Sequence, residues 1–416
     1  MTKIHRLSYL ILMLTLLSVS SFALQGCSES WNAAKTWKGA FPEHDPNDPT
    51  ANRPDRLEVT ETNIANPTRA TANQQNLPPI KVAILLPLSG QHNALGNSML
   101  QAAQMALFEM GYENFELIPR DTKATAEGAH AAAQSALNEN PQLIIGPIFA
   151  NSVRAVQSVT QGKNINIISF STDWTLAQNN TYLMGFMPFA QVDRIASYAS
   201  GLKLKNYGII APINKYGDTV TSAFKEKVAR NGGIISKEAR YMPSANNLSA
   251  QIKSFAEKSS SLDAIFIPVG GAQAETIAGL LSYHGLTPNR VKYLGSGLWD
   301  DKRLMNEHNL RGGIFAGPSP RLRKDFEKRY QALYSKAPIR LASLAYDATA
   351  LAAVLAQKGN GNYAFNKPSL TNPNGFSGTD GIFRFNQNGL VERGLAILEF
   401  SGGGIVEISP APRSFQ

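Results

Sequence analysis

The sequence predicts an α/β fold made of two lobes, each with a parallel sheet, and two observations predict it. From about residue 80 onward, short apolar runs alternate with segments of helical spacing. Such runs are typical of strands buried on both faces, and their alternation with helices implies parallel pairing through right-handed crossovers. The same alternation of apolar runs and helical segments begins again after about residue 205, which indicates a second sheet of similar size.

The elements follow one another in a regular order. In the first half, the predicted strands are residues 81–86, 115–118, 143–146 and 165–170, and the predicted helices are residues 98–110, 124–137 and 152–161. In the second half, the predicted strands are residues 207–211, 234–242, 264–268 and 291–294, and the predicted helices are residues 219–230, 248–255 and 272–284. Two sheets of similar length predict a cleft between two lobes.

The N-terminal 26 residues have the layout of a secretory signal peptide. Lys3 and Arg6 precede an apolar stretch over residues 7–22, which is shorter than the roughly 20 residues that a membrane-spanning helix needs. The stretch leads to Leu24-Gln25-Gly26-Cys27, and Cys27 is the only cysteine of the chain. Two outcomes follow: lipid attachment at Cys27, or ordinary cleavage near Ala23 with an incidental cysteine.

The segment Leu24-Gln25-Gly26-Cys27 resembles a bacterial lipobox, although the polar Gln25 departs from that pattern. The resemblance implies that Cys27 becomes the lipid-modified first residue, anchored to a membrane and exported to the periplasm. Acyl chains contribute about 0.8 kcal/mol per buried CH₂, so several of them anchor stably. Ser28 stands where an aspartate would retain a lipoprotein in the inner membrane, so the resemblance favours the outer membrane.

Residues 27–79 are predicted to form a disordered spacer ahead of a folded domain at residues 80–416. The segment is rich in Pro, Asn, Asp and Thr and poor in aliphatic side chains, so it cannot bury enough apolar surface to offset its ordering entropy. The net charge of the chain is +9, and its densest basic cluster is Arg321, Arg323, Lys324, Lys328 and Arg329. This cluster is either a solvated helix face or a surface for acidic groups; export excludes nucleic acid as the partner.

Polar loops follow several predicted strands of the first half, where the ligands of open α/β sheets bind. Free N–H groups at helix starts and nearby hydroxyls suit a small polar ligand. The alternative is that these side chains only cap helices. The candidate cleft residues in these loops are Ser89, Gly90, Phe149, Asn151, Ser152, Ser171, Thr172 and Asp173.

Five segments, taken together, resemble the leucine/isoleucine/valine-binding type of periplasmic binding protein: KVAILLPLSG, IIGP, ISFST, YGDTVTSAF and AYDATALAA. The resemblance implies a type I periplasmic binding protein fold, with two Rossmann-like lobes joined by three crossovers near residues 187, 317 and 378. It implies a first lobe of about residues 80–187 and 318–377, and a second lobe of about residues 188–317 and 378–410.

The resemblance also allows the amino-acid-binding positions of that family to be placed on this chain. The serine that grips the ligand carboxylate falls at Ala150, a threonine falls near Asp173, and the acid that meets the ligand ammonium falls around Gly297. An aspartate would repel a carboxylate and a glycine supplies no counter-charge, so a free α-amino acid is disfavoured. In the second lobe the cleft residues are Tyr216, which keeps the family's aromatic, Trp299 and Asp300.

Two functions remain open. A lipid anchor, a long spacer and the AILLPLSG opening resemble the lipoproteins called penicillin-binding protein activators, which implies regulation of a peptidoglycan synthase. The alternative is a solute-binding protein for an ABC transporter of amino acids or related small molecules. The spacer favours the first function, because a partner in the cell wall has to be reached.

Nothing in the sequence predicts an enzyme, a cofactor or a metal site. The G-x-x-x-x-G-K-[ST] phosphate loop and the G-x-S-x-G nucleophile elbow do not occur. The six histidines are scattered, without a pair at helical metal-binding spacing. The adjacent Asp300 and Asp301 are predicted to cap a helix, not to act as a catalytic pair.

Overall fold

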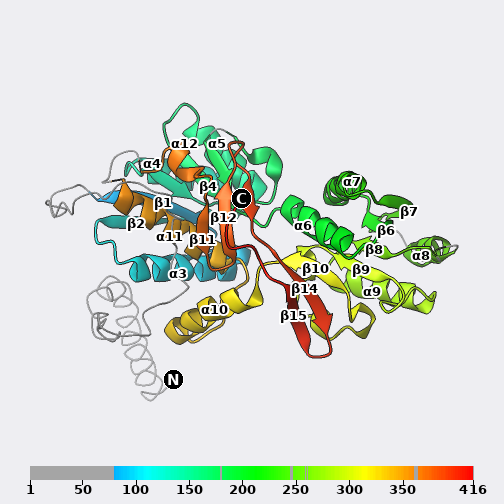
Figure 1. Ribbon diagram of the computed structural model, residues 1–416. Coiled ribbons are helices and arrows are strands. Elements are labelled where there is room, and N and C mark those ends of the chain that lie inside the picture. The colour runs from blue at the N-terminus through cyan, green and yellow to red at the C-terminus, as the bar shows by residue number, and fades with distance from the viewer. Residues whose placement is uncertain are drawn as a thin grey trace, which may run out of the picture. The chain divides into compact units, whose positions relative to one another are not determined.

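The computed structural model describes residues 79–415, with the exception of residues 179, 244–246, 258, 260 and 360–363. The predicted signal peptide, Cys27 and the predicted spacer up to residue 78 lie outside the described residues. Within the described part, no helix is both long enough and apolar enough to cross a membrane. This part of the chain forms the two predicted α/β lobes (Figure 1).

The first lobe is built on a five-stranded parallel sheet with the order β2-β1-β3-β4-β5. In β1, Val82 and Ile84 enter one hydrophobic core, and Ala83 and Leu85 enter another. Successive side chains of a strand point to opposite faces, so β1 is apolar throughout because both faces are covered. The strands are β1 (Ile80–Leu86), β2 (Phe115–Asp121), β3 (Leu143–Ile145), β4 (Asn166–Ser169) and β5 (Thr181–Leu183).

Helices supply the other half of each core in the first lobe. The helices α3 (Asn93–Met110) and α11 (Ala342–Lys358) pack in the core of Val82 and Ile84. On the opposite face lie α4 (Ala126–Leu137) and α5 (Ala150–Thr160). Outside this layer, α10 (Pro320–Tyr334) packs against α3 and α11, and α12 (Lys367–Leu370) is a short turn of helix.

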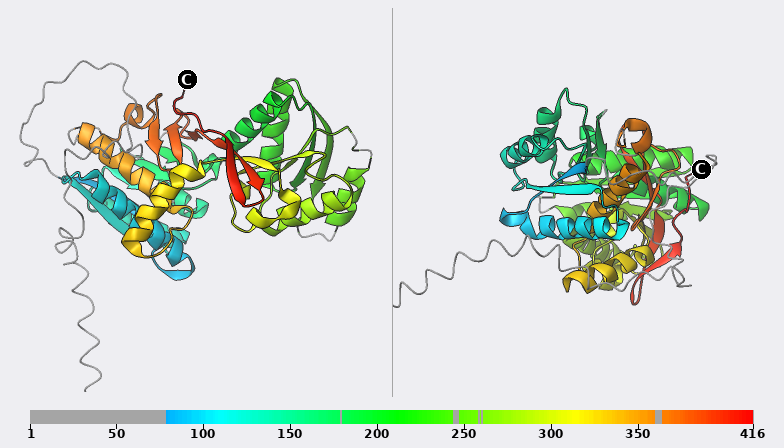
Figure 2. Two further views of the ribbon diagram at one scale, coloured as in Figure 1. Left: turned by 60° about the horizontal axis from the view of Figure 1, so that its bottom comes forward. Right: turned by 90° about the vertical axis from the view of Figure 1, so that its left-hand side faces the viewer.

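The second lobe is built on a seven-stranded sheet with the order β15-β14-β10-β9-β8-β6-β7, flanked by helices (Figure 2). Pairing is parallel from β7 to β10, whereas β14 and β15 are antiparallel, so the predicted parallel sheet gains an antiparallel edge. The strands are β6 (Asn206–Pro212), β7 (Ile234–Tyr241), β8 (Ala264–Ile267), β9 (Lys292–Gly295), β10 (Ile314–Gly317), β14 (Ala396–Ser401) and β15 (Gly404–Ser409). One core contains α6 (Pro188–Gly201) and α7 (Lys215–Arg230), and the other contains α8 (Leu248–Ala256) and α9 (Gly271–Tyr283).

The chain passes between the lobes three times. The first crossing is residues 184–187, between β5 and α6, and the second is residues 318–319, between β10 and α10. A small antiparallel sheet of β11 (Phe376–Gly378), β12 (Gly381–Phe385) and β13 (Val391–Arg393) precedes the third. Because Phe383 and Phe385 pack in the core of the first lobe, the third crossing is residues 394–395, later than the predicted crossing near residue 378.

The predicted strands and helices of both halves are confirmed, with ends that move by a few residues. The two largest changes are at helix starts: α3 begins at Asn93 instead of Ser98, and α7 begins at Lys215 instead of Thr219. Asn214 caps this earlier start, since its side chain accepts a hydrogen bond from the N–H of Gly217 at 2.8 Å. Lys215 and Tyr216 therefore lie in the first turn of a helix.

Candidate ligand site between the lobes

The loop after β1 is held by a carboxylate of the neighbouring strand. Ser89 donates a hydrogen bond from Oγ to Oδ2 of Asp121 at 2.5 Å, and the N–H groups of Leu88 and Lys123 donate to Oδ1 of Asp121 at 2.9 and 2.8 Å. Partial burial raises the pKa of Asp121, but these hydrogen bonds outweigh it and the pKa is lowered. Ser89 therefore has a structural partner already, and Gly90, with φ of 72°, makes the turn that follows.

The loop after β3 divides the predicted residues between surface and interior. Phe149 is half-buried beside His92, with ring centroids 4.8 Å apart. Asn151 is exposed and accepts a hydrogen bond from Nη1 of Arg154 at 3.2 Å. Ser152 is buried and donates to the carbonyl oxygen of Thr125 at 3.3 Å, so its hydroxyl joins α4 to α5.

The loop after β4 has one hydroxyl inside and one outside. Ser171 is buried, and its Oγ accepts a hydrogen bond from the N–H of Asp173 at 3.1 Å. Thr172 is exposed. Ser171 thus shapes the turn, and Thr172 is the hydroxyl of this loop that a ligand can reach.

Asp173 forms one of the ion pairs that join the two lobes. Its Oδ2 lies 2.8 Å from Nη2 of Arg154 in the same lobe, and its Oδ1 lies 3.3 Å from Nζ of Lys215 in the second lobe. Nζ of Lys215 also lies 5.3 Å from the ring centroid of Trp174. Partial burial raises the pKa of Asp173, but hydrogen bonds from Thr175 and Lys215 outweigh it and the pKa is lowered.

Arg154 and Lys215 change the electrostatic argument made from sequence. Two cations surround one carboxylate, so this group carries a net positive charge and does not repel an anionic ligand. Sequence analysis missed both residues. The available signals were an arginine one helical turn after Asn151 and a lysine directly before Tyr216.

The second lobe contributes one predicted aromatic residue and buries the other. Tyr216 donates a hydrogen bond to Oγ of Ser296 at 2.9 Å, and burial, partly offset by this bond, raises the pKa of Tyr216. Trp299 is completely buried in the core, where its indole N–H donates to the carbonyl oxygen of Val269 at 2.9 Å. The prediction that Trp299 lines a ligand site is therefore wrong, because its side chain anchors a loop of the second lobe.

Asp300 does not open a helix as predicted but follows the 3-10 helix Gly297–Trp299, and its side chain is nearly buried. This side chain forms ion pairs with residues beyond the second crossing. Its Oδ2 lies 2.5 Å from Nη1 of Arg323 on α10 and 3.2 Å from Nε of Arg340 in the first lobe. Asp301 accepts a hydrogen bond from the N–H of Arg303 at 2.9 Å. Asp300 therefore ties the lobes together beside the crossings.

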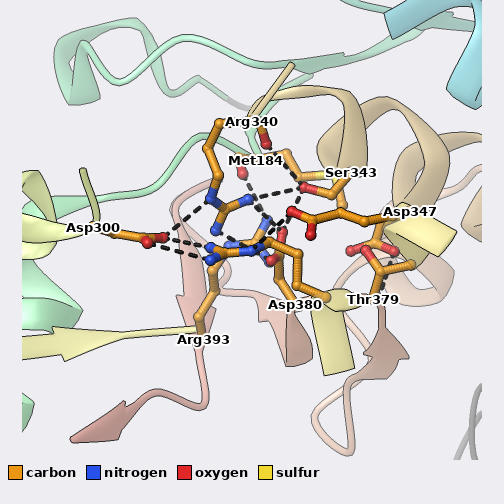
Figure 3. Close-up of polar contacts among 10 residues, drawn as sticks. Met184, Asp300, Arg340, Ser343, Asp347, Thr379, Asp380 and Arg393 are labelled. Carbon is orange, nitrogen blue, oxygen red and sulfur yellow. Dashed lines mark hydrogen bonds and ion pairs between the residues drawn. The ribbon is translucent and has the colours of Figure 1, made fainter. Parts of the chain in front are cut away.

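A buried polar cluster continues from Asp300 into the first lobe (Figure 3). Nη2 of Arg340 lies 3.1 Å from Oδ1 of Asp380, and Oγ of Ser343 donates to Oδ2 of Asp380 at 2.6 Å. Nη2 of Arg393 donates to the carbonyl oxygen of Met184, in the first crossing, at 2.8 Å. The guanidinium groups of Arg340 and Arg393 lie 4.5 and 5.0 Å from the ring centroid of Phe186, so the cluster joins the first and third crossings.

Asp347 lies next to this cluster and is fully buried in α11. Its Oδ1 accepts a hydrogen bond from the N–H of Thr379 at 2.8 Å, and its Oδ2 has no hydrogen-bond partner. Burial, together with the nearby charge of Asp380, raises the pKa of Asp347 to about 7. Sequence analysis missed this residue, although an acid in the otherwise apolar segment AYDATALAA was a visible signal.

Among the described residues, no group of three or more His, Cys, Asp or Glu side chains is placed to hold a metal ion. The accessible polar groups near the carboxyl ends of the strands include the exposed hydroxyl of Thr172 and the cations of Arg154 and Lys215, which share Asp173. Such groups can orient a small polar or anionic molecule by hydrogen bonds and charge.

A family model described as "Periplasmic binding protein" matches residues 79–403. A curated protein of unknown function from Rickettsia prowazekii is 22% identical over 185 residues, which are 44% of this chain and 49% of that protein. The chain thus spans about half the length of the curated relatives it matches.

Solved structures match nearly the whole described part. A substrate-binding protein of an ABC transporter from Desulfitobacterium hafniense, in complex with Leu, has a TM-score of 0.62 and 18% identity, and the match covers 79% of this chain and 100% of that one. A solute-binding protein from Rhodopseudomonas palustris, in complex with 3,4-dihydroxybenzoic acid, has a TM-score of 0.59 and 19% identity, with coverage of 80% and 96%. At these identities the likeness concerns the fold alone.

Proposed function

The chain belongs to the periplasmic binding protein family, and from this premise we propose that its two lobes bind a small carboxylate-bearing solute between them. The family implies a periplasmic location and a leucine-binding-protein-like fold, as in the substrate-binding proteins of ABC transporters. Binding, without chemical conversion, is the proposed activity.

The observation that carries the proposal is the cluster of Arg154, Asp173 and Lys215. It lies where ligands bind in open α/β sheets, and it joins the two lobes. Both cations remain well exposed, with 51% of the Arg154 side chain and 63% of the Lys215 side chain accessible. A ligand carboxylate can therefore replace or join Asp173 as their partner, which would hold the lobes together through the ligand.

The second lobe favours a ligand that also has an apolar part. Ile213 follows β6, Met242 follows β7 and Leu298 follows β9, so all three lie at the carboxyl edge of the sheet. About half of each of these side chains is exposed. Apolar groups that face a few polar ones are typical of small-molecule sites. Asp121, Asp173 and Asp300 are already bound to protein donors, which disfavours ligands that need a free acid for an ammonium group.

The test is ligand-induced stabilisation with benzoate and leucine as probes. A ligand at 100 times its Kd raises the free energy of unfolding by about 2.7 kcal/mol, which a melting curve detects. We expect benzoate to stabilise the protein more than leucine, and we expect the double variant Arg154→Ala, Lys215→Ala to lose the effect. Arg230→Ala, at the other end of α7, removes an ion pair with Glu226 of the same helix and is the matched control. If neither probe, nor any acid in a wider panel, raises the melting temperature, the proposal is wrong.

A second candidate function is regulation of cell-wall synthesis through contact with a peptidoglycan synthase, as in penicillin-binding protein activators. The observation that favours it is the sequence from Cys27 to residue 79, from which we infer a lipid anchor at the outer membrane and a long spacer. The ion pairs of Asp300 and Asp173 are consistent with lobes that are held together without a ligand. In this case the outer surface of the domain would act, and the interlobe site would be dispensable.

A further inference from the structure

We propose that the crossings contain a pH-sensitive link, in which ionisation of Asp347 draws Arg393 away from Met184 and loosens the first crossing. Asp347 lies in α11 of the first lobe, Arg393 ends β13 directly before the third crossing, and Met184 begins the first crossing. The three residues belong to the buried polar cluster beside the crossings (Figure 3). The proposal does not depend on the proposed function, because no ligand takes part in it.

Arg393 connects two crossings through one guanidinium group. Only 6% of the residue is exposed, and Nη2 donates to the carbonyl oxygen of Met184 at 2.8 Å. The rings of Phe186 and Phe383 lie 5.0 and 5.4 Å from the guanidinium carbon and limit its movement. Nε and Nη1 have no hydrogen-bond partner among the described residues. The guanidinium therefore keeps two donors for an acceptor that becomes charged beside it.

The carboxyl group of Asp347 is such an acceptor. The residue is fully buried; Oδ1 accepts a hydrogen bond from the N–H of Thr379 at 2.8 Å, and Oδ2 has no partner in the described part of the chain. A Cβ on Gly378 would lie 2.5 Å from Oδ2, so the backbone of this turn packs directly against the carboxyl group. Solvent cannot stabilise the ionised form there, and a buried carboxylate without a partner is costly. Ionisation of Asp347 therefore requires a donor from the protein.

Asp347 faces an acid, a phenol and a cation on the elements packed around it. Asp380, in the turn between β11 and β12, is already paired within the cluster, and its charge opposes a second negative charge. Tyr346, the preceding residue of α11, donates its hydroxyl hydrogen to Glu109 of α3, and burial raises the pKa of Tyr346. Arg393 is thus the cation of this group that can stabilise ionised Asp347.

The state of Asp347 changes near neutral pH. Burial and the charge of Asp380 raise the pKa of Asp347 to about 7, so the carboxyl group ionises as the pH rises through neutrality. The carboxylate then attracts Arg393 by a full opposite charge, which the carbonyl oxygen of Met184 lacks. The guanidinium shifts toward Asp347, and its bond to Met184 weakens. The ion pairs of Asp300 do not involve Asp347, so the effect is local to the first and third crossings.

The experiment measures amide hydrogen exchange of the full chain by mass spectrometry at about pH 5 and about pH 8, with rates corrected for the intrinsic effect of pH. The N–H of Met184 donates to the carbonyl oxygen of Ser169 at 2.7 Å, so a peptide that contains Met184 reports the first crossing. A peptide from β1, in the core, reports unfolding of the whole lobe. At the higher pH we expect protection of the Met184 peptide to fall about 10-fold more than that of the β1 peptide, since a hydrogen bond to a charged group is lost.

Two variants identify the groups involved, and a third is the control. Asp347→Asn keeps the shape of the side chain but cannot ionise, so the two peptides should change equally with pH. Arg393→Met removes the group that responds, so the Met184 peptide should be weakly protected at both pH values. Glu226→Gln, which neutralises an exposed acid on α7, is the matched control and should behave as the wild type does.

Each contrary outcome overturns the proposal. Equal changes in the two peptides of the wild type would show that pH acts on stability alone. A larger fall at Met184 that persists in Asp347→Asn would assign the effect to another acid, and one that persists in Arg393→Met would exclude Arg393 as the link. If one variant does not fold, the wild-type comparison and the other variant decide.

Discussion

Asp347 is the single acidic side chain of α11, and its environment is unfavourable for a charged carboxylate. It is fully buried, its Oδ2 lacks a hydrogen bond, and its charged neighbours are Asp380 and Arg393. The pKa of Asp380, in contrast, is lowered: burial raises it, but the ion pair with Arg340 outweighs burial. Of two acids at one site, one remains charged and the other tends to keep its proton.

We predict that Asp347→Asn removes a pH dependence of stability. The folded-state pKa of Asp347, about 7, lies above the ordinary value of 3.8. Between these values the folded protein keeps a proton that the unfolded chain has lost, so stability falls as the pH rises through this window. The effect is on the order of a few kcal/mol at most. Thermal melts between pH 4 and 7 should show a smaller decline for the variant than for the wild type.

The control for this prediction is Glu226→Gln, which neutralises an exposed acid on α7. It should leave the slope of melting temperature against pH unchanged. A variant Asp347→Asn with the wild-type slope would show that Asp347 is ionised throughout this pH window.

At the scale of single elements, the turn after β9 shows how an apolar residue in a polar loop was misinterpreted. Trp299 lies among glycines and Asp300 in the segment LGSGLWD, which is typical of a ligand loop. In the structure its ring packs over Gly295 at the end of β9, with Phe315 and Phe400 as neighbours. The ring fills the space that a side chain at position 295 would need.

Gly295→Ala should therefore destabilise the second lobe. A Cβ at this position would lie 2.1 Å from the Trp299 ring, so ring or strand must move. Overpacking of this kind costs typically 1–3 kcal/mol. The melting temperature should drop by several degrees, whereas Gly403→Ala, where nothing lies within 4 Å, should change it little. A melting temperature equal to that of Gly403→Ala would mean that Trp299 repacks without cost.

At the scale of the whole molecule, polar contacts gather at the three crossings. The first crossing contacts Arg393 through Met184, and Asp300 contacts Arg323 and Arg340 beside the second. Partly buried pairs in a network contribute more to a fixed geometry than isolated surface pairs do. This arrangement, with the interlobe pair of Asp173 and Lys215, sets the relative positions of two otherwise separate cores.

The proposed spacer gives a whole-molecule prediction that separates the two candidate functions. Deleting about 35 residues between Trp37 and Leu77 should leave the melting temperature of the domain unchanged, because a segment of this composition adds little to a core. If the protein regulates cell-wall synthesis, the deletion should impair that synthesis, because it shortens the distance that the domain can extend from the membrane. An unrelated Gly/Ser segment of equal length should then restore the synthesis. Under solute capture, uptake should depend on Arg154 and Lys215 and much less on spacer length.

Full cell-wall synthesis with the short spacer would remove the main reason for the wall partner. A lower melting temperature after the deletion would instead show that residues before 79 contribute to the folded domain.

The sequence by itself determined the fold class and four strands of each sheet, because the alternation of apolar runs and helical spacing is a local pattern; β5, β10, β14 and β15 were not predicted. Apolar Val82 to Leu85 predicts a strand covered on both faces, and the structure has one. The third crossing was placed too early because β12 and β13 alternate like any strand, and only packing assigns Phe383 and Phe385 to the first lobe.

The candidate site could be predicted from the sequence only in part, because its loops are local features and the partners of its side chains are not. The loops of Ser89, Asn151 and Thr172 follow from the ends of predicted strands. Lys215 and Asp173 are in contact although they are 42 positions apart in the sequence, and Arg393 and Met184 are in contact although they are 209 positions apart. Whether a side chain such as Trp299 or Asp347 is buried, paired or exposed depends on which elements the tertiary fold brings beside it. Burial and charge pairing are properties of that three-dimensional arrangement, so the tertiary structure alone decided them.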